Sequence, residues 1–302
     1  MKVSDQSPKG PSAHRRQGRP SPGGGTVTPT RETCAACGLS MRAAYLFQVA
    51  LLVALLVART ATATLVAAVS FRDGFVAASD RRGTATDGTF VDNYDKIHAA
   101  GSALVVVTNA NKFWLKSDLA KNYETTPPAF VLSDEIATLT PAVVSKRDLP
   151  AISKASARAL GAFFEWDKEL YASVDVALVD FLLPTWEAGF LISTDASGTP
   201  VSSTPELRDV GLDTPIYVLI LGQPQYLQKV IAAHLVSTAT LQTLASPPRV
   251  RDMTLDAATA LASDLVESAE RATAVIPPRW GIGGGLDLWS VTGTGPHHIL
   301  TK

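Results

Sequence analysis

The sequence predicts an α+β fold in which two antiparallel β-sheets pack face to face and helices cover both outer surfaces. The predicted strands and helices come in blocks, without the regular β-α alternation of a doubly wound sheet. The strands are apolar at nearly every position, which indicates that both faces of each sheet are covered. The cluster Gly283–Gly285 precedes a strand instead of opening a helix, so it does not predict a dinucleotide-binding loop.

The first two strands are predicted to form a hairpin. Leu65–Ser70 and Phe75–Ser79 are apolar runs, and the Asp73-Gly74 pair between them is typical of a tight turn. Two further apolar runs predict strands at Phe90–Val91 and Ala103–Thr108.

The middle of the chain, residues 112–172, is predicted to be mostly helical with breaks at its prolines, and Ile152–Leu170 has the clearest helical spacing. Hydrophobic runs then predict four strands, at Val174–Leu182, Trp186–Ser193, Thr199–Ser203 and Ile216–Leu221. The remaining predicted elements are a helix at Tyr226–Leu241, a helix at Leu255–Ala274 capped by Thr254, and a last strand at Leu286–Thr292.

The N-terminal part is predicted to lie outside this domain. Residues 43–58 are almost purely apolar, Arg42 precedes them, and Ala61-Thr62-Ala63 follows, which is the order of a secretory signal. We therefore divide the chain into a disordered extension (1–40), which could lie upstream of a true start at Met41, a signal segment (41–63), and one domain (64–302). The alternative is an uncleaved signal anchor formed by residues 43–58.

Composition narrows the functions. The net charge of −1 gives no electrostatic basis for binding nucleic acid. Both cysteines, Cys34 and Cys37, precede the expected cleavage site, so the mature domain has no disulfide or thiol chemistry. The five histidines show no metal-ligand spacing, and we expect no cofactor and no metal.

The expected cleavage after Ala63 gives the chain a chemical starting point. It would make Thr64 the first residue, with a hydroxyl nucleophile and its own base, the free α-amine. Counting on from Thr64, Asp80 comes sixteen residues later and Lys96 thirty-two residues later.

These positions carry a resemblance to a known family. The segments TLVAAVSFRDGFVAASDRRGT and FVDNYDKIHAAGSALVVVTNA resemble the start of mature proteasome β-subunits and of the related bacterial HslV-type peptidases, over Thr64–Asn111. The resemblance implies the four-layer αββα sandwich of N-terminal nucleophile hydrolases. It also implies a homo-oligomer and a peptide or small amide substrate.

The resemblance also implies a role for each matching residue. Thr64 would be the nucleophile, and Lys96 beside it would lower the pKa of the amine and the hydroxyl. Asp80 would hold Lys96 in place. The backbone N–H of Ala110 would stabilise the oxyanion.

The chain departs from the family pattern in two places. Gly222-Gln223-Pro224 lacks the serine that the family carries in this turn. Residues 277–283 contain neither the aspartate nor the serine that the family carries just before its last strand. Gln223, Arg279 and Ser290 are candidate replacements.

Two functions therefore remain open. The first is an exported (periplasmic or secreted) threonine peptidase or amidohydrolase. The second is a catalytically silent proteasome-like assembly or binding subunit, exported or membrane-anchored. We expect contact with a membrane only through residues 43–58, if they stay attached.

Overall fold

Antiparallel pairing organises the computed structural model, which describes residues 64–84, 90–113, 126–166, 177–276 and 281–302. These residues belong to one compact unit. The predicted disordered extension and signal segment, residues 1–63, lie outside the described residues. The predicted α+β class with antiparallel sheets is confirmed.

The first sheet has the strand order β13-β1-β2-β14-β15. Its strands are β1 (Leu65–Phe71), β2 (Gly74–Asp80), β13 (Val218–Gly222), β14 (Leu286–Thr292) and β15 (Gly295–Thr301). The predicted hairpin of β1 and β2 is confirmed, since Phe71 pairs with Gly74 across the turn. β14 was predicted to be the last strand, which is wrong. β15 follows it as an edge strand whose polar, exposed residues hide it from a search for apolar runs.

The second sheet has the order β11-β10-β9-β6-β5, and β12 also pairs with β10. Its strands are β5 (Ile97–Ala100), β6 (Ala103–Thr108), β9 (Ala177–Leu183), β10 (Trp186–Thr194), β11 (Pro200–Ser202) and β12 (Glu206–Asp209). The sequence did not predict β5 or β12, because both lack a continuous apolar run. Two short pairs complete the strands: β3 (Gly83–Thr84) with β4 (Phe90–Val91), and β7 (Lys112–Phe113) with β8 (Phe130–Val131).

The helices are α2 (Leu132–Leu139), α3 (Leu149–Trp166), α4 (Pro224–Ala232), α5 (Thr238–Ala245) and α6 (Leu255–Ala272), with a 3₁₀ turn at Val250–Asp252. The prediction of helix from residue 112 is wrong where β7 and β8 form. The prediction of one helix at Tyr226–Leu241 is also wrong. His234 has a φ of 56°, which ends α4 locally, and the Ser237 side chain then accepts the Thr240 N–H to begin α5.

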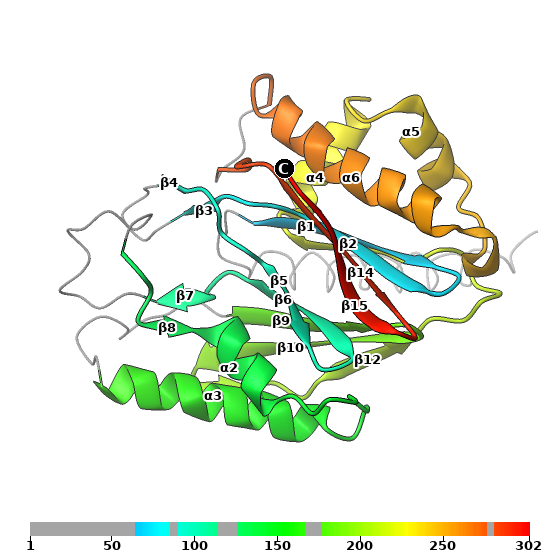
Figure 1. Cartoon of the computed structure of the whole chain (residues 1–302). Helices are drawn as coiled ribbons and strands as arrows, with labels where there is room; N and C mark the ends of the chain where they lie inside the picture. Colours follow the sequence, from blue (N-terminus) through cyan, green and yellow to red (C-terminus); the bar gives the residue numbers. More distant parts are fainter. Residues whose placement is uncertain (1–63, 85–89, 114–125, 167–176, 277–280) are drawn as a thin grey trace, which may run out of the picture. The chain divides into compact units, whose positions relative to one another are not determined.

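Three hydrophobic clusters show how these elements pack. In the first, the face of β1 and β2 that carries Leu65 and Ala67 packs against α4 and α6. In the second, β6, β9 and β10 pack against α2 and α3. The third contains side chains of both sheets, among them Val66 and Phe75 from the first and Leu104 and Leu182 from the second. The sheets therefore face each other, and helices lie on the side of each that is turned away (Figure 1).

Burial on both faces explains the strand composition. Every residue of β1 and β2 is buried, which matches the near-absence of polar alternation in these two strands. Within the described part of the chain, no helix is long and apolar enough to cross a membrane.

Candidate active site

Asp80 and Lys96 form a buried ion pair at one end of the two sheets. Asp80 is the last residue of β2, and Lys96 directly precedes β5. The Lys96 carbonyl accepts the Val107 N–H at 3.0 Å, which fixes this residue beside β6. The Lys96 Nζ atom lies 2.6 Å from Asp80 Oδ1, and both side chains are 0% exposed. The two candidate residues, which are sixteen positions apart in sequence, are thus in direct contact.

Thr64 adjoins this pair through the first peptide of β1. The N–H of Leu65 donates to Asp80 Oδ1 at 2.7 Å, the same oxygen that accepts Lys96 Nζ. One carboxylate oxygen therefore binds the ammonium and the backbone immediately after Thr64. Thr64 itself is 5% exposed.

Gly222 fixes the main chain of Thr64 from the other side. It pairs with Leu65 across β1 and β13 and has a φ of +84°. A Cβ atom here would lie 1.8 Å from the Thr64 carbonyl oxygen. Only glycine permits so close an approach and this backbone conformation together.

The second oxygen of Asp80 is bound by backbone groups. Oδ2 accepts the Arg82 N–H at 3.4 Å and the Gly283 N–H at 3.3 Å. Burial raises the pKa of Asp80, while the Lys96 charge and these N–H donors act against that rise. Ionised Asp80 thus has a donor on each oxygen in addition to its ion pair.

Lys96 is equally confined. Besides Asp80, its ammonium donates to the Arg82 carbonyl oxygen at 2.8 Å. Burial lowers the pKa of Lys96, and the adjacent Asp80 carboxylate opposes this shift. A cation held here would disfavour protonation of any amine placed beside it.

A glycine-rich segment, residues 281–285, supplies the Gly283 N–H; we call it the glycine strap. Gly283, Gly284 and Gly285 all have positive φ values, of 146°, 77° and 93°. The Arg81 N–H donates to the carbonyl oxygens of Gly283 and Gly285, at 3.0 and 3.1 Å. The described part of the segment before β14 thus offers a backbone donor to Asp80. Three consecutive glycines before a strand indicate an unusual backbone here, but they do not indicate which group this backbone contacts.

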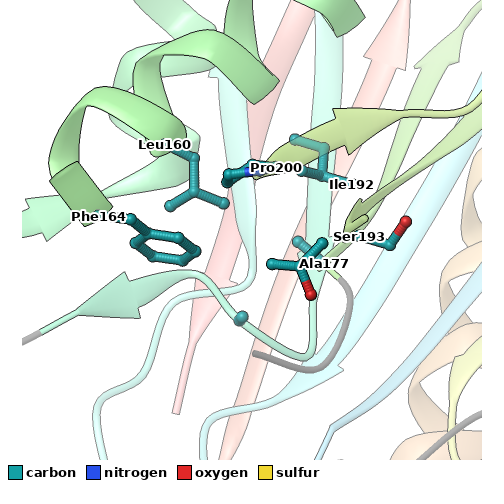
Figure 2. A pocket seen from close by; sticks show the side chains of 8 residues that line it. Leu160, Phe164, Ala177, Ile192, Ser193 and Pro200 are labelled. Atoms are coloured by element: carbon teal, nitrogen blue, oxygen red, sulfur yellow. The ribbon is translucent and has the colours of Figure 1, made fainter. Parts of the chain in front are cut away.

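Ala110 lies just beyond β6, after Asn109, whose φ is +79°. Its methyl group lines a small apolar recess between α3 and the second sheet (Figure 2), together with Leu160, Phe164, Ala177, Ile192, Ser193, Thr194 and Pro200. Of the described residues, neither Asp80 nor Lys96 lines this recess. The role of the Ala110 N–H as an oxyanion donor stays a prediction.

The three candidate replacements differ in position. Gln223 directly follows Gly222 and is 9% exposed, so it adjoins the backbone that touches Thr64. Ser290 lies four residues along β14 from Leu286, the partner of Asp80, which separates it from the ion pair by about 13 Å. Arg279 lies outside the described residues. Among residues 64–302 that are described, no group of three or more acidic, histidine or cysteine side chains could hold a metal ion.

No family model and no curated protein matches the chain. Among solved structures, it is similar to the Anbu Gly-1 mutant from Hyphomicrobium sp. strain MC1, with a TM-score of 0.40 and 14% identity over 79% of this chain and 86% of that one. It is also similar to Anbu, an ancestral beta-subunit, from Yersinia bercovieri, with a TM-score of 0.38 and 15% identity over 78% and 87% of the two chains. Likeness at this level does not establish a shared fold.

The family assignment made from residues 64–111 is therefore wrong. A resemblance confined to about fifty residues is not matched by any family model, and the two Anbu structures cover 79% and 78% of this chain with TM-scores of only 0.40 and 0.38. A buried hairpin followed by a lysine is a local arrangement, which does not by itself specify a family.

Proposed function

We propose that the chain, once it begins at Thr64, is an exported threonine hydrolase that cleaves amide bonds in peptides or small amides. The observation that supports this most is the fully buried Lys96–Asp80 pair, which shares an oxygen with the first peptide after Thr64. A buried cation beside a chain terminus is suited to activating an amine and a hydroxyl. We also infer that the fold is a four-layer αββα sandwich. The packing of helices against the outer face of each sheet supports this inference.

The proposed reaction is acyl transfer followed by hydrolysis. The Thr64 hydroxyl oxygen attacks the substrate carbonyl carbon, and its proton passes to the α-amine. The carbon–nitrogen bond breaks, and the departing nitrogen takes that proton. Water, deprotonated by the same amine, then attacks the ester carbon. The bond from that carbon to the Thr64 oxygen breaks, and this oxygen takes back the proton from the amine, which releases the acid and restores the hydroxyl.

Electrostatics supports the amine as the base. A free α-amine has an ordinary pKa of about 7.7 to 8.0, and a neighbouring cation lowers it. Lys96 would supply that cation, and Asp80 keeps it in place. The negative oxygen formed during attack would be bound by the Ala110 N–H, in our proposal.

Maturation is part of the proposal. While Ala63 is attached, the Thr64 nitrogen is an amide and cannot act as a base. We propose that a signal peptidase cuts after Ala63 during export, so that export and activation are one event. Separately from maturation, we propose that the mature chain assembles into a homo-oligomer.

The first experiment is to express the full chain in a secretory host and determine the mature N-terminus by mass spectrometry. The product is then assayed with peptide amides and labelled with an epoxyketone or β-lactone. We expect Thr64 at the N-terminus, labelling at Thr64, and loss of hydrolysis in Thr64→Ala with an unchanged melting temperature. Full activity in Thr64→Ala would exclude the mechanism. A correctly processed protein that neither hydrolyses nor labels would instead be a catalytically silent binding subunit.

A further inference from the structure

Arg82 links the candidate catalytic pair to a second ion pair nearer the surface. Its main chain contacts both members of the first pair: the N–H donates to Asp80 Oδ2 at 3.4 Å, and the carbonyl accepts Lys96 Nζ at 2.8 Å. The position of the Arg82 peptide therefore helps to set the position of the ammonium.

Arg82 directly precedes β3, and its side chain is held by two groups in and next to β4, the strand that pairs with β3. Its Nε and Nη2 atoms donate to the two carboxylate oxygens of Asp92, at 2.7 and 3.0 Å. Its guanidinium carbon also lies 5.1 Å from the centre of the Phe90 ring. A bidentate arginine–carboxylate contact restricts orientation as well as distance, which a single charge contact does not.

The glycine strap packs directly on this arrangement. Added Cβ atoms would lie 3.2 Å from Arg82 Nη1 at Gly283, 2.8 Å from Asp92 Oδ1 at Gly284, and 2.4 Å from the Phe90 ring at Gly281. The lack of side chains at Gly281, Gly283 and Gly284 thus allows the strap to rest on Phe90, Arg82 and Asp92 while Gly283 donates to Asp80. Both ion pairs and the strap form one contiguous unit.

We propose that the Arg82–Asp92 ion pair, seated against Phe90 and the glycine strap, is a positioning device that holds the Lys96 ammonium at the start of β1 through the Arg82 main chain. Arg82 and Asp92 touch no reacting atom in this scheme; they act through the peptide of Arg82. The catalytic part of the inference rests on the proposed function, but the position of Lys96 does not.

An alternative explanation is that this pair is an ordinary surface contact. The side chains of Arg82 and Asp92 are 29% and 42% exposed, and ion pairs with such exposure contribute little to stability. The two explanations differ in their readout, because only a positioning role changes the environment of buried Lys96.

The test compares Arg82→Gln, Arg82→Lys and Asp92→Asn with wild type. Arg72→Gln is the matched control, since Arg72 forms an exposed pair with Asp73 at the far end of the β1–β2 hairpin. Each protein is isolated from the same host. Hydrolysis is measured, and the Lys96 ammonium is followed by ¹⁵N NMR, with Lys96→Met identifying its signal.

We expect the Lys96 signal to shift in Arg82→Gln and Asp92→Asn, partial recovery in Arg82→Lys, and no change in Arg72→Gln. Hydrolysis should fall up to roughly 100-fold in kcat, because small misplacements of catalytic groups have effects of that size. If wild type does not hydrolyse any substrate, the proposed function fails while the NMR comparison still decides this inference. An unchanged Lys96 signal in both Arg82→Gln and Asp92→Asn overturns it. Should Arg82→Gln fail to fold, the nearly isosteric Asp92→Asn decides alone.

Discussion

Replacing Gly222 with alanine tests whether β13 fixes the backbone of Thr64. The added methyl would lie 1.8 Å from the Thr64 carbonyl oxygen and 2.6 Å from its carbon, and both are backbone atoms that no rotamer change can move. One strand must therefore shift by more than about 1 Å to reach ordinary contact. The φ of +84° adds about 1 to 2 kcal/mol of strain for a residue with a Cβ atom.

The shift should also weaken the end of the β1–β13 ladder, where each lost hydrogen bond is worth about 1 kcal/mol. We therefore expect Gly222→Ala to lower the free energy of unfolding by about 2 to 4 kcal/mol. Chemical denaturation monitored by circular dichroism measures it. If the proposed hydrolysis is present, its kcat should fall by about 100-fold.

Alanine substitutions at two other glycines distinguish the effect of backbone strain from the effect of a steric clash. Gly198 has nearly the same φ, +82°, but nothing lies within 4 Å of its added Cβ, so Gly198→Ala reports backbone strain alone. Gly293 also has nothing within 4 Å, and its φ is not in the left-handed region, so Gly293→Ala should be neutral or nearly so. If Gly222→Ala is no less stable than Gly198→Ala, the close approach to Thr64 does not constrain the backbone as argued.

Three further changes have expected outcomes. Lys96→Met should lower the free energy of unfolding by about 3 to 5 kcal/mol, measured by chemical denaturation, because it leaves buried Asp80 without its cation. Adding Asp80→Asn should recover part of this loss. Equal stability of the single and double variants would contradict the expectation. Burial lowers the pKa of His98 below its ordinary value, so the stability it contributes is present above about pH 6.5 and is lost as the pH falls through the folded-state pKa. His98→Gln should therefore flatten the fall in melting temperature between pH 7.5 and 5, and an unchanged slope would argue against it. Leu265→Ala, in the buried face of α6, should cost about 2 to 5 kcal/mol by the same denaturation assay while leaving the Lys96 NMR signal in place; a moved signal would show that the helix layer and the site are coupled.

Local signals in the sequence were enough for the β1–β2 hairpin, because both strands and the turn lie within sixteen consecutive residues. The edge strands β12 and β15 were missed for the opposite reason. Their side chains are largely exposed, so no apolar run marks them, and their place in a sheet depends on a neighbour elsewhere in the chain.

In the candidate site, too, some groups could be predicted from the sequence and others could not. Asp80 and Lys96 were singled out by their spacing from Thr64, since charged side chains are visible in a sequence. Gly283 and the Arg82 main chain were not, because backbone donors and acceptors are present at every position and only the fold selects which ones point at Asp80. The break between α4 and α5 was missed because a positive φ is usually marked by glycine, and the residue that adopts it here is His234.

The contact between Gly283 and Asp80 joins positions 203 residues apart. A ribosome makes the Asp80 region long before it reaches the strap, so a growing polypeptide carries the acid and the lysine without the last of their partners. Any fragment that stops short of residue 283 lacks it as well. The surroundings of the Lys96–Asp80 pair are therefore completed only when the strap has been made and β14 has paired with β2.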